Sequence, residues 1–233
     1  MKAKFKILLI AMLAIHTALW ADEYPNIHPT MSVTNADGDT SDEENFSGSA
    51  PIKASLAANP SDDIGWNAHY EWRIYQDNDT VPYIIRYEEN TDVEFNKSGL
   101  HRILLYAKFT KDDDVIETSN EESPFTITVS ESILQMPNAF SPNGDGINDI
   151  YKAKDGYQSL VEFHAYIFNR WGKKLYEWSD PAGGWDGTTG GKPVKDGVYF
   201  VLVKAKGADG KTYNIKRDVN LLRGYIETGT SNP

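Results

Sequence analysis

The chain has 233 residues, a formal net charge of −11 and no cysteine. Without cysteine, disulfides, thiol catalysis and cysteine-ligated zinc are excluded, so each folded domain must depend on its hydrophobic core. The acidic balance argues against nucleic acid or anionic lipid as a partner, because phosphate groups are bound by basic surfaces. The simpler interpretation, which we favour, is that the acidity maintains solubility.

The first residues of the chain, Met1–Ala21, predict a cleaved signal peptide. Three lysines in the first six residues form a positive region, and an apolar run over Ile7–Ile15 follows it. This run is too short for a membrane-spanning helix, which needs about 20 apolar residues. No cysteine follows, which excludes lipid attachment at a new N-terminal cysteine. We therefore expect an exported chain with no membrane span after cleavage.

Charge divides the rest of the chain into two parts. Residues 22–135 hold 23 acidic and 7 basic residues, a net charge of −16, whereas residues 136–233 hold 11 acidic and 13 basic residues, a net charge of +2. Such a break supports a domain boundary near Ser130–Pro137. We predict an acidic first domain over 22–135, a second domain over 136–223 and a polar tail over 224–233. Limited proteolysis is expected to cut first at the junction or in the acidic leader.

Short alternating apolar and polar runs, separated by turn residues, dominate the first predicted domain. The sequence of this domain shows no amphipathic helix pattern, and Lys111–Asp114 predicts a hairpin turn. Several short strands of this kind indicate an Ig-like β-sandwich, and we expect Trp72 to lie in its core as the anchor of the sandwich. The predicted strands are Ile52–Leu56, His69–Tyr75, Tyr83–Tyr87, Leu100–Phe109 and Phe125–Val129.

Three segments of the first domain resemble bacterial PKD-like and Ig-like modules. They are Ala50–Ile52, Tyr70–Arg73 and Lys97–His101. The Trp-Asp-Phe-Gly-Asp-Gly type of motif found in PKD domains is missing after Trp72, and so is the disulfide of antibody-type domains. The resemblance therefore implies the fold and does not name a ligand.

The second predicted domain is also rich in strand patterns. Ala208-Asp209-Gly210 is a hairpin signal, and the spacer Asp180–Gly197 is too rich in Gly, Pro and Asp for regular structure. The chain is therefore predicted to be all-β, with two small Ig-like β-sandwich domains in tandem after a signal peptide. The predicted strands of the second domain are Val161–Asn169, Lys174–Trp178, Val198–Ala205 and Thr212–Leu222.

Four motifs occur in a fixed order within Met136–Arg223: a Pro-Asn-Gly-Asp-Gly loop, an Asn-Arg-Trp-Gly turn, a Trp-Asp-Gly-Thr stretch and a Gly-Val-Tyr-Phe strand start. This order resembles the gliding motility-associated C-terminal domain, the type B sorting domain of the Bacteroidota type IX secretion system. The resemblance points to these motif residues: Pro142, Asn143, Gly144, Asp145, Gly146, Asn148, Asp149, Asn169, Arg170, Trp171, Gly172, Trp185, Asp186, Gly187, Gly197 and Tyr199.

The resemblance implies an export address. Its partners would be the type IX secretion machinery and an outer-membrane helper protein, and the route would run through the periplasm to the cell surface or the medium. Gly144 and Gly146 allow positive φ in a tight turn. Trp171, Trp178 and Trp185 offer apolar surface to close a small core. A machine that depends on such residues would recognise a folded surface rather than a linear peptide.

The loop Ser141–Asp149 also has features of a calcium loop. Oxygen-bearing residues fall at its positions 1, 3, 5 and 9, with glycine at position 6, as in EF-hand loops. The candidate ligands are Asn143, Asp145 and Asp149. Only two of these are carboxylates, and Lys152 stands where an EF-hand has glutamate. We therefore expect an Asx-rich turn and no cofactor, with calcium as the alternative.

No pattern of catalytic residues emerges from the sequence. The mature histidines are scattered and show no metal-ligand spacing, and neither a Gly-x-Ser-x-Gly elbow nor a P-loop occurs. We predict a non-catalytic, surface-located or secreted binding or structural module, whose first domain binds an unknown protein or glycan. The alternative is a small secreted carbohydrate-binding module, with Trp66, Tyr70 and Tyr83 lining a sugar face. The scattered histidines of the mature chain, which show no metal-ligand spacing, are His28, His69, His101 and His164.

Overall fold

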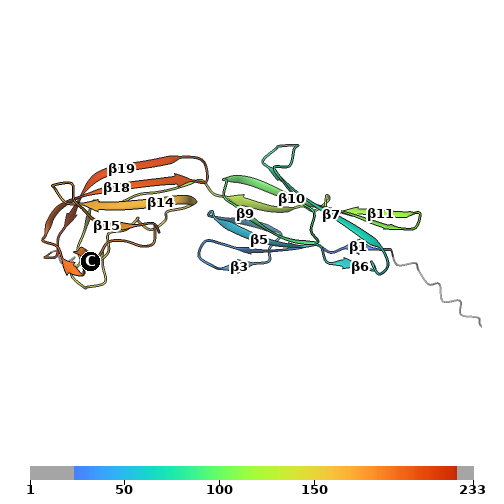
Figure 1. The fold of residues 1–233 in the computed structure, drawn as a ribbon, viewed down its shortest axis with the longest axis horizontal. Coiled ribbons are helices and arrows are strands. Elements are labelled where there is room, and N and C mark those ends of the chain that lie inside the picture. The colour runs from blue at the N-terminus through green and yellow to red at the C-terminus, as the bar shows by residue number, and fades with distance from the viewer. Residues whose placement is uncertain (1–23, 225–233) are drawn as a thin grey trace, which may run out of the picture.

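The computed structural model of the protein describes residues 24–224, which form two lobes placed end to end (Figure 1). This part of the chain is built from strands, and it contains no helix long and apolar enough to cross a membrane. The all-β fold with tandem β-sandwich domains is therefore confirmed. The predicted signal peptide and nearly all of the predicted polar tail lie outside the described residues.

The first domain is a sandwich of two sheets. The larger sheet has the strand order β4-β12-β10-β7-β8, and β11 pairs with the second half of β10. Its pairings are antiparallel except for β4 with β12. These strands are β4 (Asn45–Gly48), β7 (Asn67–Gln76), β8 (Ile84–Arg86), β10 (Gly99–Lys111), β11 (Asp114–Ser119) and β12 (Phe125–Val129).

The smaller sheet has the order β3-β2-β5-β9 and is antiparallel throughout. A short ribbon of two strands, β1 and β6, lies beside the two sheets. These strands are β1 (Asn26–Ile27), β2 (Thr30–Thr34), β3 (Thr40–Ser41), β5 (Ile52–Ala57), β6 (Pro60–Ser61) and β9 (Asn90–Phe95).

The core of the first domain comes from the inward-facing residues of its strands. Alternate residues of β5 and β7 are buried, as period-two strands facing a second sheet require. Trp72 is fully buried, and its indole Nε1 donates a hydrogen bond to the Glu88 carbonyl at 3.2 Å. The prediction that Trp72 belongs to the core of this domain is confirmed.

The second domain has one five-stranded sheet, in the order β13-β19-β18-β14-β15, and a separate short hairpin of β16 and β17. The pairings within the sheet are antiparallel except for β13 with β19. The strands are β13 (Ala139–Phe140), β14 (Leu160–Phe168), β15 (Lys174–Trp178), β16 (Thr188–Thr189), β17 (Lys192–Pro193), β18 (Gly197–Gly207) and β19 (Thr212–Leu221).

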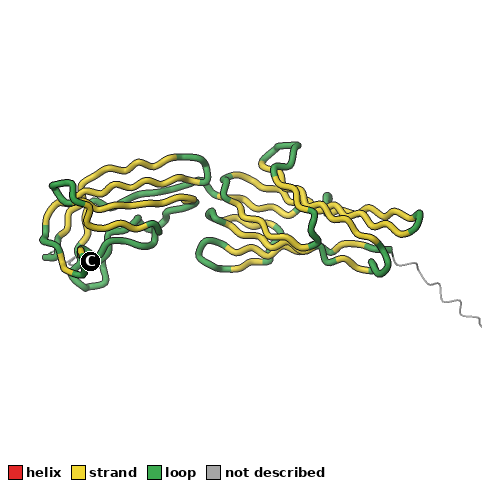
Figure 2. The backbone as a smooth tube through the Cα atoms, in the orientation of Figure 1, coloured by secondary structure: helices red, strands yellow, loops and turns green. Residues whose placement is uncertain are grey.

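Loops form most of the layer that covers the inner face of this sheet. Tyr151, Ala153 and Trp185 lie in connecting segments, yet each is at most 2% exposed and belongs to the core. Figure 2 shows how much of the far end of this lobe is loop. The second domain therefore depends on its loops to close its hydrophobic core.

The strands predicted from the alternating patterns all have counterparts in the structure, with ends shifted by a few residues at most. The hairpin turn at Lys111–Asp114 is also confirmed, with Asp112 at φ 51°. The sequence did not predict the first-domain strands β2, β4, β9 and β11 or the two-residue strands β1, β3 and β6. In the second domain it missed β13, and the short hairpin of β16 and β17 lies in the spacer that was expected to have no regular structure.

The segment between the domains is packed, which bears on the expectation that a protease would cut first either at this junction or in the acidic leader. Ser132 is 5% exposed, and its hydroxyl donates to the carboxylate of Asp209 at 2.8 Å. The Tyr213 hydroxyl donates to the Ser132 carbonyl at 2.9 Å. Because a protease needs an accessible, extended backbone, this segment is a poor first site.

Further hydrogen bonds join the two domains directly. The amide of Ser98 donates to the carbonyl of Ala208 in the β18–β19 turn at 3.1 Å. The amide of Ala50 donates to the Ser159 hydroxyl at the same distance. Ala208 is buried against the core of the first domain. The β18–β19 turn therefore marks the end of the second domain that faces the first.

Candidate functional site

The Pro-Asn-Gly-Asp-Gly loop is organised around Asp149. Its carboxylate accepts hydrogen bonds from the amides of Asn143, Gly144 and Gly146 at 2.9, 2.7 and 2.8 Å. The bonds from Gly144 and Gly146 hold the pKa of the Asp149 carboxyl below its usual range. Both glycines have positive φ, at 84° and 85°. These motif residues therefore maintain the shape of the loop.

The same loop uses the other polar residues of the motif for internal bonds. Asp145 accepts from the Ile147 amide at 2.8 Å, and Asn143 accepts from the Asp145 amide at 3.0 Å. Asn148 has a φ of 54°, and its carbonyl accepts from the Ser141 amide.

The candidate calcium ligands Asn143, Asp145 and Asp149 are thus arranged to accept from amides. Residues 24–224 contain no group of three or more His, Asp or Glu side chains placed to hold a metal ion. The geometry is that of an Asx-rich turn.

Trp185, from the third motif, is a core residue. It is fully buried, and its ring centroid lies 5.3 Å from Phe140 and 5.1 Å from Tyr199. The indole Nε1 donates to the Thr188 carbonyl at 2.7 Å, and the Asp186 carboxylate accepts from the Thr188 amide at 2.9 Å. The third and fourth motifs therefore meet at this indole, together with Phe140, which precedes the loop of the first motif.

Gly187 is required by close packing as well as by its φ of 78°. A Cβ atom at this position would lie 3.0 Å from Pro142 Cγ, 3.1 Å from Leu221 Cδ1 and 3.0 Å from Arg223 Nη2. Any side chain would push these neighbours apart, so Gly187 marks the point where the first and third motifs touch the end of β19.

Arg223 joins this cluster although no motif contains it. Its guanidinium donates to the carbonyls of Gly187 and Val194, and its Nη1 lies 2.9 Å from Asp196 Oδ1. The Arg223 amide donates to the other oxygen of Asp196 at 2.9 Å. Arg223 therefore binds two loops to the end of β19. No local pattern predicts this role of Arg223, because its partners Gly187, Val194 and Asp196 are distant along the chain.

The second motif forms the turn between β14 and β15. The Asn169 side-chain oxygen accepts from the amides of Trp171 and Lys173, both at 3.0 Å, and Gly172 has a φ of 80°. Asn169 and Gly172 shape this turn. Trp171 is 81% exposed, so the prediction that it helps to close the core is wrong. The turn projects the indole into solvent, whereas Trp178 packs against the core as predicted.

A groove of about 320 Å³ lies between this turn and the segment that leads into β18. Gly197, with a φ of 144°, begins β18, and the Tyr199 hydroxyl donates to the Lys195 carbonyl at 2.6 Å. We call this feature the Trp171 groove. Its lining residues are Asn169, Arg170, Trp171, Leu175, Val194, Lys195, Asp196, Gly197, Val198 and Tyr199.

All four motifs thus gather at one end of the second domain. Leu160 of β14 pairs with Gly207 beside the first domain, whereas Phe168 pairs with Phe200 at the other end, next to the second motif. The predicted motif residues therefore lie at the end that faces away from the first domain. Most of them shape or fill this end, whereas the side chains of Arg170 and Trp171 are exposed and do neither.

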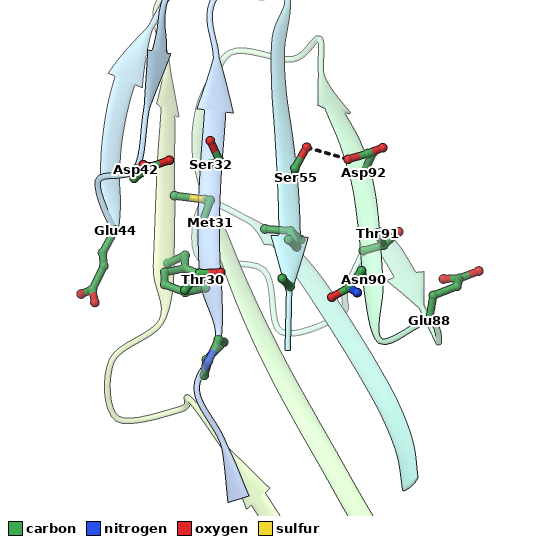
Figure 3. Close-up of a pocket in the computed structure, with 14 residues that line it drawn as sticks. Thr30, Met31, Ser32, Asp42, Glu44, Ser55, Glu88, Asn90, Thr91 and Asp92 are labelled. Carbon is green, nitrogen blue, oxygen red and sulfur yellow. Dashed lines mark hydrogen bonds between the residues drawn. The ribbon is translucent and has the colours of Figure 1, made fainter. Parts of the chain in front are cut away.

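The first domain has a larger hollow of about 820 Å³, lined mainly by residues of β2, β5 and β9 in its smaller sheet. Hydroxyl and carboxylate groups surround it, and Figure 3 shows the Ser55 hydroxyl bonded to Asp92 at 2.7 Å. We call it the β2–β5–β9 hollow. Four of its lining residues are acidic: Asp42, Glu44, Glu88 and Asp92.

The three aromatic residues proposed for a sugar face do not form one row. Tyr70 is 7% exposed and packs edge-to-face against Phe109 at 6.1 Å. Trp66 is half-buried against the core. Tyr83 is 38% exposed and shares a hydrogen bond with His101.

His101 is buried between two partners. Its Nε2 lies 2.8 Å from the Lys97 carbonyl and its Nδ1 lies 2.9 Å from the Tyr83 hydroxyl. A carbonyl can only accept, so Nε2 carries the proton and Nδ1 accepts from Tyr83. Burial lowers the pKa of His101 and raises that of Tyr83 to about 12. This pair is a neutral hydrogen-bonded core element.

The fold and the motif cluster define an all-β protein whose second domain has the features of a sorting module. Residues 134–218 match the family described as the CHU_C Type IX secretion signal domain. The resemblance predicted from the order of the motifs is therefore confirmed, and the match supports export to the cell surface or the medium.

The solved structures similar to the chain include the following two. One is the mixed-linkage glucan utilization locus protein SGBP-B of Bacteroides ovatus in complex with a mixed-linkage heptasaccharide, with 14% identity over 85% of this chain and a TM-score of 0.29. The chain spans 47% of that protein. The other is a tetra-tandem repeat from the extending region of a large adhesion protein, with 10% identity, 87% and 68% coverage of the two chains and a TM-score of 0.29. At these TM-scores the similarity carries no functional argument. No curated protein matches the chain.

Proposed function

We propose that the second domain directs the protein across the outer membrane, after a signal peptide has directed it across the inner one. The observation that carries this proposal is the meeting of the four motifs at one exposed end of a domain that matches a type IX secretion signal domain. The partners proposed for this step are the type IX machinery and an outer-membrane helper protein.

A reporter experiment tests this proposal. A reporter carrying Met1–Ala21 and Met136–Pro233 is expected to reach the cell surface or the medium of a host with a type IX system. The same reporter without Met136–Pro233 is expected to remain in the periplasm. Equal export of the two reporters would refute the proposal.

We propose that the first domain is a non-catalytic binding or structural module. Its support is the placement of the three histidines of this domain: His28, His69 and His101 lie on separate segments, and both ring nitrogens of His101 are hydrogen-bonded. Limited to the described residues, no cluster of acidic and imidazole groups offers a metal centre.

A small carbohydrate-binding module remains the second candidate, because the β2–β5–β9 hollow is lined by hydroxyl, amide and carboxylate groups. Such groups can hydrogen-bond sugar hydroxyls, although the buried Phe125 is the only aromatic residue in the lining. A glycan screen with the mature chain distinguishes the two candidates. Binding that is lost in both Ser32→Trp and Ser55→Trp, which would fill the hollow, would favour the carbohydrate module.

A further inference from the structure

Trp171 is exposed for no reason that the fold supplies. It is 81% exposed, and the shape of its turn is set by the side chain of Asn169 and the positive φ of Gly172. A side chain of this size in water forgoes the free energy that burial would provide. Exposed tryptophan and arginine are the residues that most often anchor protein interfaces. The turn therefore presents Trp171 and Arg170 rather than packing them.

Apolar surface continues from the indole along the Trp171 groove and onto the sheet. Leu175 and Val198 line the groove, and Val198 is 44% exposed. Two residues further along β18, Phe200 is 46% exposed and faces Phe168 across the strand pair. Exposed apolar residues grouped in this way at one end of a domain favour an interaction surface over scattered single residues.

The charged residues around the groove indicate which kind of partner could bind there. Asp196 is the acidic residue of its lining, and both carboxylate oxygens of Asp196 accept hydrogen bonds from Arg223. Arg170 and Lys195 are exposed at the rim, and among the described residues neither makes a salt bridge. The guanidinium of Arg170 lies 5.5 Å from the Trp171 ring centroid. A partner that pairs with these cations must bring a carboxylate beside an apolar side chain.

The position of the groove suits a general export contact. The opposite end of the second domain contacts the first domain, because the carbonyl of Ala208 accepts a hydrogen bond from the amide of Ser98. The turn between β14 and β15, which forms one side of the Trp171 groove, lies at the end of the domain that faces away from the first domain (Figure 1). A partner can therefore reach the groove whatever domain precedes it.

We propose that the Trp171 groove docks a protein segment of the export machinery that carries an apolar side chain and a carboxylate, with Trp171 as the anchor and Arg170 and Lys195 as its charge contacts. This inference rests on the proposed function of the second domain. It adds the surface and the chemistry of recognition, which that function leaves open.

The inference is tested by measuring export of the full chain with changes in the residues of the groove. Trp171→Ala and the double variant Arg170→Glu with Lys195→Glu are each expected to lower the exported fraction roughly tenfold or more, as loss of an interface anchor does. Trp171→Phe is expected to restore part of it. Lys204→Glu makes the same kind of charge change on an outward-facing residue of β18 and should export normally.

The controls separate the inference from the function on which it rests. If deletion of Met136–Pro233 blocks export but the Trp171 and rim variants export normally, the docking surface is refuted and the sorting function stands. If the chain that lacks Met136–Pro233 is exported normally, both the docking surface and the sorting function are refuted. Since the changed side chains are exposed, melting temperatures should stay close to that of the parent. If Trp171→Ala lowers the melting temperature, its export result is set aside, and the exported fraction of the variant with Arg170→Glu and Lys195→Glu tests the docking surface instead.

A photo-crosslinking residue at position 171 identifies the class of partner. During export it is expected to form an adduct with an outer-membrane component of the type IX machinery, and the same residue at position 204 is not. An adduct with lipid alone would overturn the proposal, because it would assign this exposed surface to the membrane. Equal protein adducts at the two positions would overturn it as well.

Discussion

The two domains close their cores in different ways. In the first, both layers are hydrogen-bonded sheets, and the buried Trp72 lies in the middle of a ten-residue strand. In the second, one sheet is covered by connecting segments, and the buried Trp185 lies in a loop. A change in a loop of the first domain should therefore alter the surface, whereas a change in a motif loop of the second should weaken the fold.

This difference explains why a sorting sequence can be spread over loops and still specify one shape. The loop residues Pro142, Gly187 and Arg223 are held by mutual contact and by bonds to backbone carbonyls. The recognised end is then a packed surface, and the motif order in the sequence records which loops must meet. Four changes can break or sharpen this comparison.

The largest effect is expected from truncating the two buried indoles. Trp72→Ala and Trp185→Ala should each destabilise their own domain by about 3–5 kcal/mol, because each leaves a large cavity. Calorimetry of the mature chain should show one transition lowered in each variant. If either change lowers both transitions together, the domains unfold as one unit, and the comparison of separate cores is broken.

Removing the guanidinium of Arg223 is expected to have the next largest effect. Arg223→Ala leaves the carbonyls of Gly187 and Val194 without this partner, and a loss of about 1–3 kcal/mol of second-domain stability is expected. Chemical denaturation measures it. Arg170→Ala removes an exposed guanidinium from the same end and is the matched control. Equal losses of stability in the two variants would mean that the hydrogen bonds of Arg223 do not stabilise the second domain.

A smaller effect is expected where only backbone strain changes. Gly146→Ala and Gly38→Ala both place a Cβ atom at positive φ, and nothing lies within 4 Å of either atom. Each should cost about 1–2 kcal/mol. Only Gly146→Ala should also impair export, because Gly38 lies in a turn of the first domain. Normal export of a destabilised Gly146→Ala variant would show that this loop does not shape the recognised end.

The smallest effect should be a difference in acid sensitivity. Burial lowers the pKa of His101 from its ordinary value of 6.5. The unfolded first domain therefore takes up a proton below about pH 6.5 that the folded domain refuses. Its stability is full above this pH and falls as the pH drops towards the lowered pKa.

In the second domain, the pKa of Asp149 is also lowered, by amide hydrogen bonds. An acid with a lowered pKa contributes stability above its ordinary value of 3.8 that is lost only as the pH falls below it. As the pH is lowered from about 8 to about 5, the melting temperature of the first domain should therefore fall before that of the second. His101→Gln should flatten this dependence, and an unchanged slope would show that another group causes it.

The strands that the sequence missed show where alternation fails as a signal. β4 is a short edge strand whose parallel pairing with β12 joins residues about 80 positions apart, so no local turn predicts it. β9 carries only two buried residues, Val93 and Phe95, among polar ones. The longer strands were predicted because each presents several apolar residues to one face, as β10 does.

The sequence by itself determined the all-β class, the strands with clear alternation and the order of the four motifs, because period-two patterning and turn residues act locally. Only the tertiary structure decided which motif residues are buried and which are presented. Trp171 and Trp185 are the same residue type in neighbouring motifs, yet one is exposed and the other is fully buried. The sequence cannot separate them, because burial depends on Phe140, Tyr199 and the other distant segments that the fold brings to Trp185 and not to Trp171.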